Sequence, residues 1–242
     1  MFPSRFLFPV LFSTAVLGNI EKEIFVAPSN SQDLLFNGTN SPQSAGFEAL
    51  HPGLLRLSPS PSCEGTCHEL HVTLDTSFIG SGESHWAVLD HLEQGKRYEV
   101  RICWAATSPT DLTLNIYTAS QLLDKPSLLA NMTAYATHQL PPSPVNKLSC
   151  PSAAPRSVLY LNIRAKAGYY THEKHRMETP DPVRVEIVLD PFILNALPES
   201  LLPIAVTIIL TALSAFWLSG RVYNILRNIA SLKQSRYDKK TR

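Results

Sequence analysis

Residues 200–220 read SLLPIAVTIILTALSAFWLSG, a run of 21 residues without a charged side chain between Glu199 and Arg221. As an α-helix this run would be about 31 Å long, which matches the hydrocarbon core of a bilayer. Its apolar side chains favour insertion by on the order of 3 to 6 kcal/mol, enough to outweigh Pro203. A buried soluble helix is the alternative, but such a helix normally has a polar face and this run has none. The sequence therefore predicts a transmembrane helix over residues 199–220.

The N-terminal residues follow the pattern of a secretory signal peptide. A single charge, Arg5, precedes the apolar run 6–17, which is too short to span a bilayer. Small residues at positions −3 and −1 favour cleavage after Gly18. We therefore expect a signal peptide over residues 1–18, with an uncleaved anchor or a buried helix as the alternatives.

Charge is distributed unevenly about the predicted span. The whole chain has a net charge of +1, whereas residues 19–200 carry 13 basic and 19 acidic residues and residues 221–242 carry 7 basic and 1 acidic. The positive-inside rule places such a basic tail in the cytosol. The sequence thus predicts a type I, single-pass protein with a lumenal part over residues 19–198 and a cytosolic tail over residues 221–242.

The lumenal part shows apolar residues at every second position in short runs that are separated by turn-forming residues. Runs of this kind are typical of half-buried strands, and two apolar sheet faces must pack together to bury them. We therefore expect an all-β lumenal domain with an antiparallel, sandwich-like fold and no long helix before the span. Residues 32–61 and 139–155 are rich in turn formers and predict long loops. The predicted strand segments are 24–26, 70–74, 86–89, 98–103, 112–116, 159–163 and 183–189.

Four cysteines and two glycosylation sequons lie on the predicted lumenal side. Cysteines in an oxidising compartment are disulfide candidates, and four of them allow three pairings that the sequence leaves open. Asn-x-Thr sequons accept N-linked glycans. The disulfide candidates are Cys63, Cys67, Cys103 and Cys150, and the glycosylation candidates are Asn37 and Asn131.

The basic tail combines a helical apolar pattern with a lysine pair near its end. Apolar residues recur at 222, 225, 226, 229 and 232, which predicts a helix. This helix either lies on the anionic cytosolic leaflet or continues the transmembrane helix into solvent, and both alternatives remain open. Lys239 and Lys240 stand four and three positions from the end, like the dilysine signal that coat proteins read to retrieve type I proteins to the endoplasmic reticulum. A basic tail that ends this way by chance is the alternative.

The lumenal part contains clusters of potential metal ligands, but their spacing does not fit metal sites. His68 and His71 fall one residue short of the H-E-x-x-H spacing that places two imidazoles on one helical face, and His172 and His175 fail in the same way. No nucleophile elbow or phosphate-binding glycine loop occurs, and the basic residues are too dispersed for nucleic-acid binding. We therefore expect no catalytic, cofactor-binding or metal-binding residues.

The segment 98–104, YEVRICW, gives a resemblance to a known family. With the N-terminal segment Asn19-Ile-Glu21 and the layout described above, it resembles the fungal GPI-mannosyltransferase II co-activator family. The matching positions are Tyr98, Val100, Arg101, Ile102, Cys103 and Trp104.

This resemblance implies a non-catalytic subunit of the endoplasmic reticulum. Its partner would be the multi-spanning mannosyltransferase that adds the second mannose to the glycosylphosphatidylinositol (GPI) precursor from dolichol-phosphate mannose. The lumenal domain and the membrane helix would dock on the catalytic subunit and stabilise it. No cofactor and no nucleic acid are implied.

Three other functions compete with this one. A p24-like cargo receptor has a similar layout, but it requires a coiled coil before the membrane, where this chain has Pro180, Pro182, Pro191 and Pro198. The stabilising subunit of the first GPI mannosyltransferase differs mainly in its partner. A lumenal glycosidase or thiol oxidoreductase would need paired carboxylates or a C-x-x-C motif.

Overall fold

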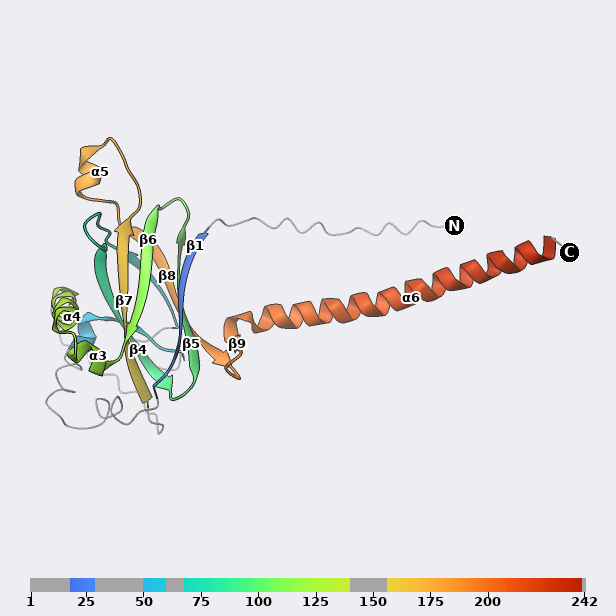
Figure 1. Ribbon diagram of the computed structural model, residues 1–242, viewed down its shortest axis with the longest axis horizontal. Helices are drawn as coiled ribbons and strands as arrows, with labels where there is room; N and C mark the ends of the chain where they lie inside the picture. The colour runs from blue at the N-terminus through green and yellow to red at the C-terminus, as the bar shows by residue number, and fades with distance from the viewer. Residues whose placement is uncertain (1–17, 29–49, 60–67, 140–155, 241–242) are drawn as a thin grey trace. The chain divides into compact units, whose positions relative to one another are not determined.

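The structure of the protein is a computed structural model that describes residues 18–28, 50–59, 68–139 and 156–240. The chain forms two compact units, the first ending at Pro191 and the second beginning at Phe192. Figure 1 shows that strands dominate the first unit and that one long helix dominates the second.

The first unit contains two sheets. In sheet A the strands lie in the order β1 (Gly18–Val26), β5 (Arg97–Ala105), β8 (Val183–Ile193) and β3 (Glu69–Leu74), and all neighbours are antiparallel. In sheet B the order is β2 (Leu55–Leu57), β4 (Glu83–Glu93), β7 (Arg156–Ala167) and β6 (Thr110–Tyr117), and β2 runs parallel to β4.

The two sheets share one apolar core, as the alternating pattern requires. Ile102 and Ile187 from sheet A and Leu89 and Leu161 from sheet B are fully buried in the same cluster. Each of the seven segments predicted as strands lies within an observed strand. The expected sandwich-like β fold is therefore confirmed for the described residues, apart from the parallel pairing of β2.

A helical layer covers the outer face of sheet B and was not expected. It consists of the 3-10 turn η1 (His51–Gly53) and the helices α3 (Ala119–Leu123) and α4 (Pro126–Gln139). Its second apolar cluster includes Trp86 and Tyr160 from the sheet and Met132 and Ala136 from α4. The expectation of a domain with no long helix before the span is therefore wrong for residues 126–139, and β2 interrupts the predicted loop 32–61.

The sequence of α4 explains why the periodicity missed it. Met132 and Ala136 are its only fully buried apolar residues, so the buried stripe is narrow and one of its members is a small residue. The start signals are clearer, because Thr118 forms a capping box with Gln121 at the preceding helix and Pro126 occupies the first position of α4.

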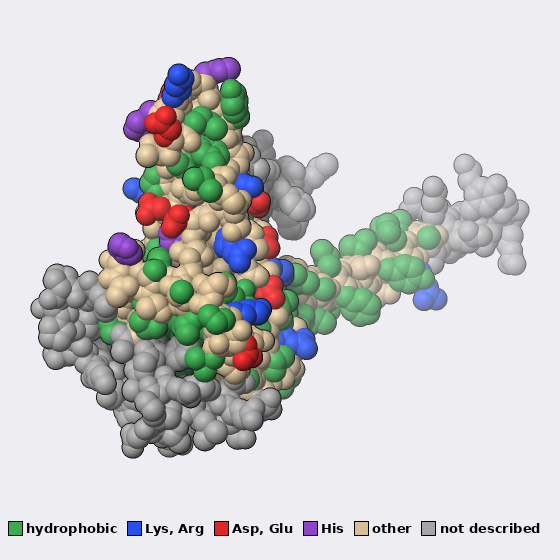
Figure 2. All heavy atoms as spheres, turned by 60° about the vertical axis from the view of Figure 1, so that its left-hand side comes forward, with side chains coloured by type: hydrophobic (Ala, Val, Ile, Leu, Met, Phe, Trp, Pro, Cys, Tyr) green, Lys and Arg blue, Asp and Glu red, His purple; other side chains and the backbone are tan. Residues whose placement is uncertain are grey.

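The second unit is a membrane-type helix preceded by a short hairpin arm. Strand β9 (Leu197–Pro198) pairs with the end of β8, and the 3-10 turn η2 (Glu199–Leu201) leads into α6 (Leu202–Lys240). Within the described residues, one stretch, Glu199–Ala230, is long and apolar enough to cross a membrane. Figure 2 shows hydrophobic side chains along the described length of this helix. The predicted span 199–220 lies inside that stretch.

Polar groups within the apolar part of α6 are satisfied locally. The Thr207 hydroxyl donates to the Ile204 carbonyl over 2.7 Å, and the Ser214 hydroxyl donates to the Leu210 carbonyl over 2.7 Å. Such bonds lower the cost of placing a hydroxyl in hydrocarbon. Helix α6 runs without interruption to Lys240, so the residues of the predicted tail helix continue the membrane-type helix in this structure.

Candidate functional site on sheet A

The segment that carries the family resemblance is strand β5, at an inner position of sheet A. Tyr98, Val100 and Ile102 point into the sandwich and are fully buried. The Tyr98 hydroxyl accepts a hydrogen bond from the Glu93 amide over 2.9 Å, and its ring stacks on Phe25 with centroids 5.8 Å apart. Burial raises the pKa of Tyr98 to about 12. This half of the segment is therefore part of the core.

The alternate residues of β5 form a charged surface on the outer face of sheet A. Glu99 and Asp190 lie directly opposite each other in neighbouring strands, and each is only 5% exposed. Lys22 Nζ lies 3.4 Å from Glu99, and Arg101 Nη1 lies 3.7 Å from Asp190. Because each carboxylate has a cation nearby, two like charges can occupy adjacent buried positions.

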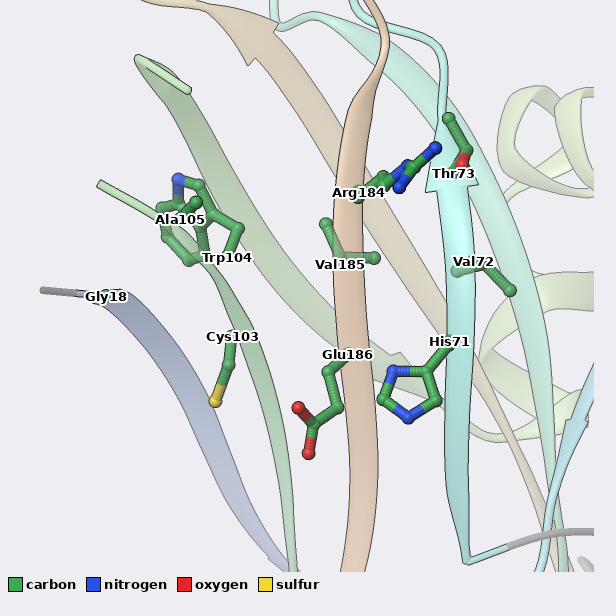
Figure 3. Close-up of a pocket in the computed structure, with 10 residues that line it drawn as sticks. All are labelled: Gly18, His71, Val72, Thr73, Cys103, Trp104, Ala105, Arg184, Val185 and Glu186. Carbon is green, nitrogen blue, oxygen red and sulfur yellow. The ribbon is translucent and has the colours of Figure 1, made fainter. Parts of the chain in front are cut away.

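Beyond these pairs, one row of side chains crosses all four main strands of sheet A. Strand register places Ile20, Cys103, Glu186 and His71 opposite one another in turn. Figure 3 shows the last three side chains in a row across β5, β8 and β3. They border a shallow depression that also includes Trp104.

Two residues of the family-like segment, Cys103 and Trp104, border the depression. Burial, and to a smaller extent the nearby Glu186 carboxylate, raises the pKa of the Cys103 thiol. A raised pKa disfavours the reactive thiolate. The Trp104 indole nitrogen is buried and has no hydrogen-bond partner among the described residues. Trp104 packs partly against the core of the sandwich, and the Cys103 thiol is poorly suited to nucleophilic chemistry.

Glu69, His71 and Glu186 bring potential metal ligands together on this face. Their ligand atoms lie within 4.8 Å of one another, and His71 Nε2 lies 3.0 Å from Glu69 Oε1. The His71 side chain is 72% exposed, so water competes directly for these groups. The three residues form a solvated polar cluster, and nothing about them beyond their proximity points to a metal.

The second histidine cluster is an exposed structural element. His172 precedes helix α5 (Lys174–Glu178) and His175 lies within it, and both side chains face solvent. Arg176 pairs with Glu173 at 3.4 Å and with Asp181 at 3.2 Å. These are solvent-exposed ion pairs within a surface loop, and such pairs contribute little to stability.

The glycosylation candidate Asn131 lies in the middle of α4. Its Oδ1 accepts a hydrogen bond of 2.8 Å from the indole nitrogen of Trp86, which is fully buried in the second apolar cluster. Asn131 itself is exposed. N-linked glycosylation uses the amide nitrogen, so a glycan there is compatible with this bond. Asn37 lies outside the described residues.

The other predicted site residues are described only in part. Cys103 has no disulfide within the described residues, and Cys63, Cys67 and Cys150 lie outside them. Lys239 and Lys240 belong to the helical backbone at the end of α6. The disulfide pairing, both glycans and the retrieval signal therefore remain predictions.

Sequence reasoning missed the residues that complete this surface. It selected segment 98–104 but not the residues that pair with it from the neighbouring strands. These are Glu186 beside Cys103, Asp190 beside Arg101, and Lys22 beside Glu99, and each lies at least 77 residues from its partner in the chain. Alternation predicts which residues share a face of one strand, but the register between strands comes only from the fold.

The fold and this surface define a class: a β-sandwich with paired charges on the outer face of one sheet, followed by one apolar helix long enough to cross a membrane. Residues 63–132 match the model of the GPI-mannosyltransferase II co-activator family, which supports the family suspected from the sequence. The match includes β3, β4, β5, β6 and α3 in full and about half of α4. No curated protein and no solved structure matches the chain.

Proposed function

We propose that this protein is a non-catalytic co-activator subunit of the endoplasmic reticulum mannosyltransferase that adds the second mannose during GPI-anchor biosynthesis. The observation that carries the proposal is the family match over residues 63–132, which contains the complete strand β5 and its Tyr98–Trp104 segment. On this proposal the chain contributes no group to the sugar transfer.

The two units support this function in different ways. The apolar stretch Glu199–Ala230 would hold the protein in the same bilayer as a multi-spanning enzyme. On the outer face of sheet A, the more exposed Lys22 and Arg101 side chains offer polar contacts to a folded partner, and the buried carboxylates Glu99 and Asp190 lie beside them. A subunit that binds only the folded enzyme stabilises it by mass action.

The proposal includes an orientation for the chain. The sandwich would lie in the lumen, where Asn37 and Asn131 would carry glycans and the four cysteines Cys63, Cys67, Cys103 and Cys150 would be available for disulfides. The basic tail would lie in the cytosol, where coat proteins would read Lys239 and Lys240 as a retrieval signal. Protease added to intact microsomes should therefore remove only a tail of a few kilodaltons and leave the glycosylated part intact.

Depletion of the protein tests the proposed function most simply. Depleted cells should accumulate a GPI precursor with a single mannose, and extraction in mild detergent should recover the second mannosyltransferase with the chain. Accumulation of a precursor without mannose would favour the first mannosyltransferase as the partner. Normal GPI synthesis with slowed export of a cargo set would favour a cargo-receptor function.

A further inference from the structure

The turn between β8 and β9 has an unusual backbone for its sequence. Leu194 and Asn195 adopt φ angles of 52° and 55°, in the left-handed region. The turn is closed by a hydrogen bond of 3.0 Å from the Ala196 amide to the Ile193 carbonyl. Asparagine enters this region readily, but leucine rarely does, because its β-carbon crowds the following carbonyl. The turn therefore holds Leu194 in a conformation that glycine or asparagine would adopt with less strain.

The fold does not compensate for this strain by burying the side chain. Leu194 is 94% exposed, the largest exposed fraction among the large hydrophobic residues of the described part of the chain. The neighbouring Ile193 is 36% exposed. In water, a leucine at this position therefore has two costs: a strained backbone conformation and an apolar side chain exposed to solvent.

The position of the turn indicates what covers it. Leu194 belongs to the same compact unit as α6, which begins only eight residues later, at Leu202. Strand β9 folds back along β8 and η2 is a single turn, so this short connection is compact rather than extended. Figure 1 shows β9 leading directly into α6. Leu201 and Leu202, at the helix entry, are 40% and 44% exposed, so exposed apolar side chains occur both at the turn and at the start of the helix.

We propose that the Leu194 turn is a second membrane contact, which inserts into the interface of the leaflet that α6 enters. The occupant is lipid rather than protein because the turn is continuous in the chain with the membrane-type helix and offers an apolar tip. Between Leu194 and Leu202 the only charged residue is Glu199, so the contact does not depend on anionic headgroups. Together, α6 and the Leu194 turn would fix the rotation of the protein about the helix axis, which a single membrane helix leaves free. This inference rests on α6 spanning the membrane, and it does not depend on the identity of the enzyme partner.

Site-specific photocrosslinking in the full chain tests the proposal. The photoreactive residue p-benzoyl-phenylalanine replaces Leu194 in protein reconstituted into phosphatidylcholine vesicles that contain a clickable phosphatidylcholine. A matched control carries the probe at Ile79, an 84% exposed residue on a turn of the first unit. A positive control carries it at Leu210, inside the apolar stretch of α6.

We expect lipid adducts at 194 several-fold above those at 79 and approaching those at 210. Adducts at 194 that do not exceed those at 79, while 210 is strongly labelled, would overturn the proposal. Weak labelling at 210 would overturn it as well, because α6 would then not lie in the bilayer.

A substitution separates membrane contact from folding. Leu194→Asn should keep or raise the unfolding temperature, because asparagine tolerates the left-handed backbone. In the same vesicles it should lower crosslinking from a probe placed at the adjacent Ile193 several-fold. Unchanged crosslinking from Ile193 would contradict a role for the Leu194 side chain, whereas a lowered unfolding temperature would show that leucine is needed by the fold itself.

Discussion

Tyr98 shows how one residue of the family-like segment serves the core. Its ring is fully buried and its hydroxyl accepts the Glu93 amide, so the neutral form is strongly favoured in the folded protein. The pKa of Tyr98 rises from 10.0 to about 12 for this reason. Above pH 10 the unfolded state loses this proton while the folded state retains it, so stability decreases as pH rises.

We predict that the free energy of unfolding falls by about 2 to 3 kcal/mol through this residue between pH 10 and pH 12. Tyr98→Phe should be less stable than the natural protein at neutral pH, because the Glu93 amide loses its acceptor, and the difference should shrink as pH rises. Denaturant unfolding at a series of pH values measures this. The control Tyr170→Phe changes a ring that is 79% exposed and should leave the pH dependence unaltered. A constant difference between Tyr98→Phe and the natural protein would contradict the argument.

Asn131 combines a predicted glycan with a structural hydrogen bond, and two substitutions separate these roles. Asn131→Leu should remove both the glycan and the acceptor of the Trp86 indole, which costs about 1 to 3 kcal/mol because a buried donor is left unpaired. Thr133→Ala should remove the same glycan but keep the bond. Gel mobility reports the glycan and thermal unfolding reports the stability. Equal destabilisation by both substitutions would mean that the glycan, and not the Trp86 bond, stabilises this layer.

At the scale of elements, the sequence predicted the strands well and the helical layer poorly. Period-two alternation located five of the seven long strands because their apolar faces lie in the core, as Val183, Val185 and Ile187 of β8 illustrate. The other two gave only short apolar segments, since β1 is largely exposed and the middle of β4 is buried on both faces. Strand β2 has only three residues, too few for a period, and α4 buries too narrow a stripe to stand out. The functional surface was predictable only in part, because Glu186 joins Cys103 through strand register alone.

Gly53 allows the turn η1 to pack closely against helix α4. A β-carbon at this position would overlap the carbonyl of Ala136 in α4. We predict that Gly53→Ala destabilises the protein by about 1 to 3 kcal/mol and raises amide hydrogen exchange across α4. The comparison is Gly95→Ala, where φ is +71° but the space is open. Gly95→Ala should lower stability because alanine disfavours a positive φ, but it should not raise hydrogen exchange in α4. Similar exchange in α4 for both variants would contradict the proposed close contact between Gly53 and Ala136.

The apolar helix α6 can be tested by introducing one charge at two depths. Ile209 and Ile229 are similarly exposed, at 58% and 57%, but only Ile209 lies within the predicted span 199–220. An arginine near the middle of a span costs about 2.5 to 3.5 kcal/mol, comparable to the whole predicted insertion energy. Ile209→Arg should therefore make the protein extractable from membranes by alkaline carbonate, whereas Ile229→Arg should stay in the pellet. Equal extraction of both variants would contradict a span that ends near Gly220.

On the scale of the whole molecule, the two units suit a subunit that acts through another protein. The first unit has a packed core, a helical layer over sheet B and a charged outer face on sheet A. The second unit supplies an apolar helix. The family match lies within the first unit, so the features most specific to the proposed function belong to the sandwich and not to the helix.

The central claim is that this chain activates the second GPI mannosyltransferase without performing the transfer. The most direct measurement is mannose transfer from labelled dolichol-phosphate mannose in microsomes depleted of the chain, with the chain restored in one sample. We predict that depleted microsomes stop at the single-mannose GPI intermediate, that the restored chain recovers the second transfer, and that the purified chain alone transfers nothing. Second-mannose transfer at an undiminished rate in depleted microsomes that still contain the enzyme would contradict the account.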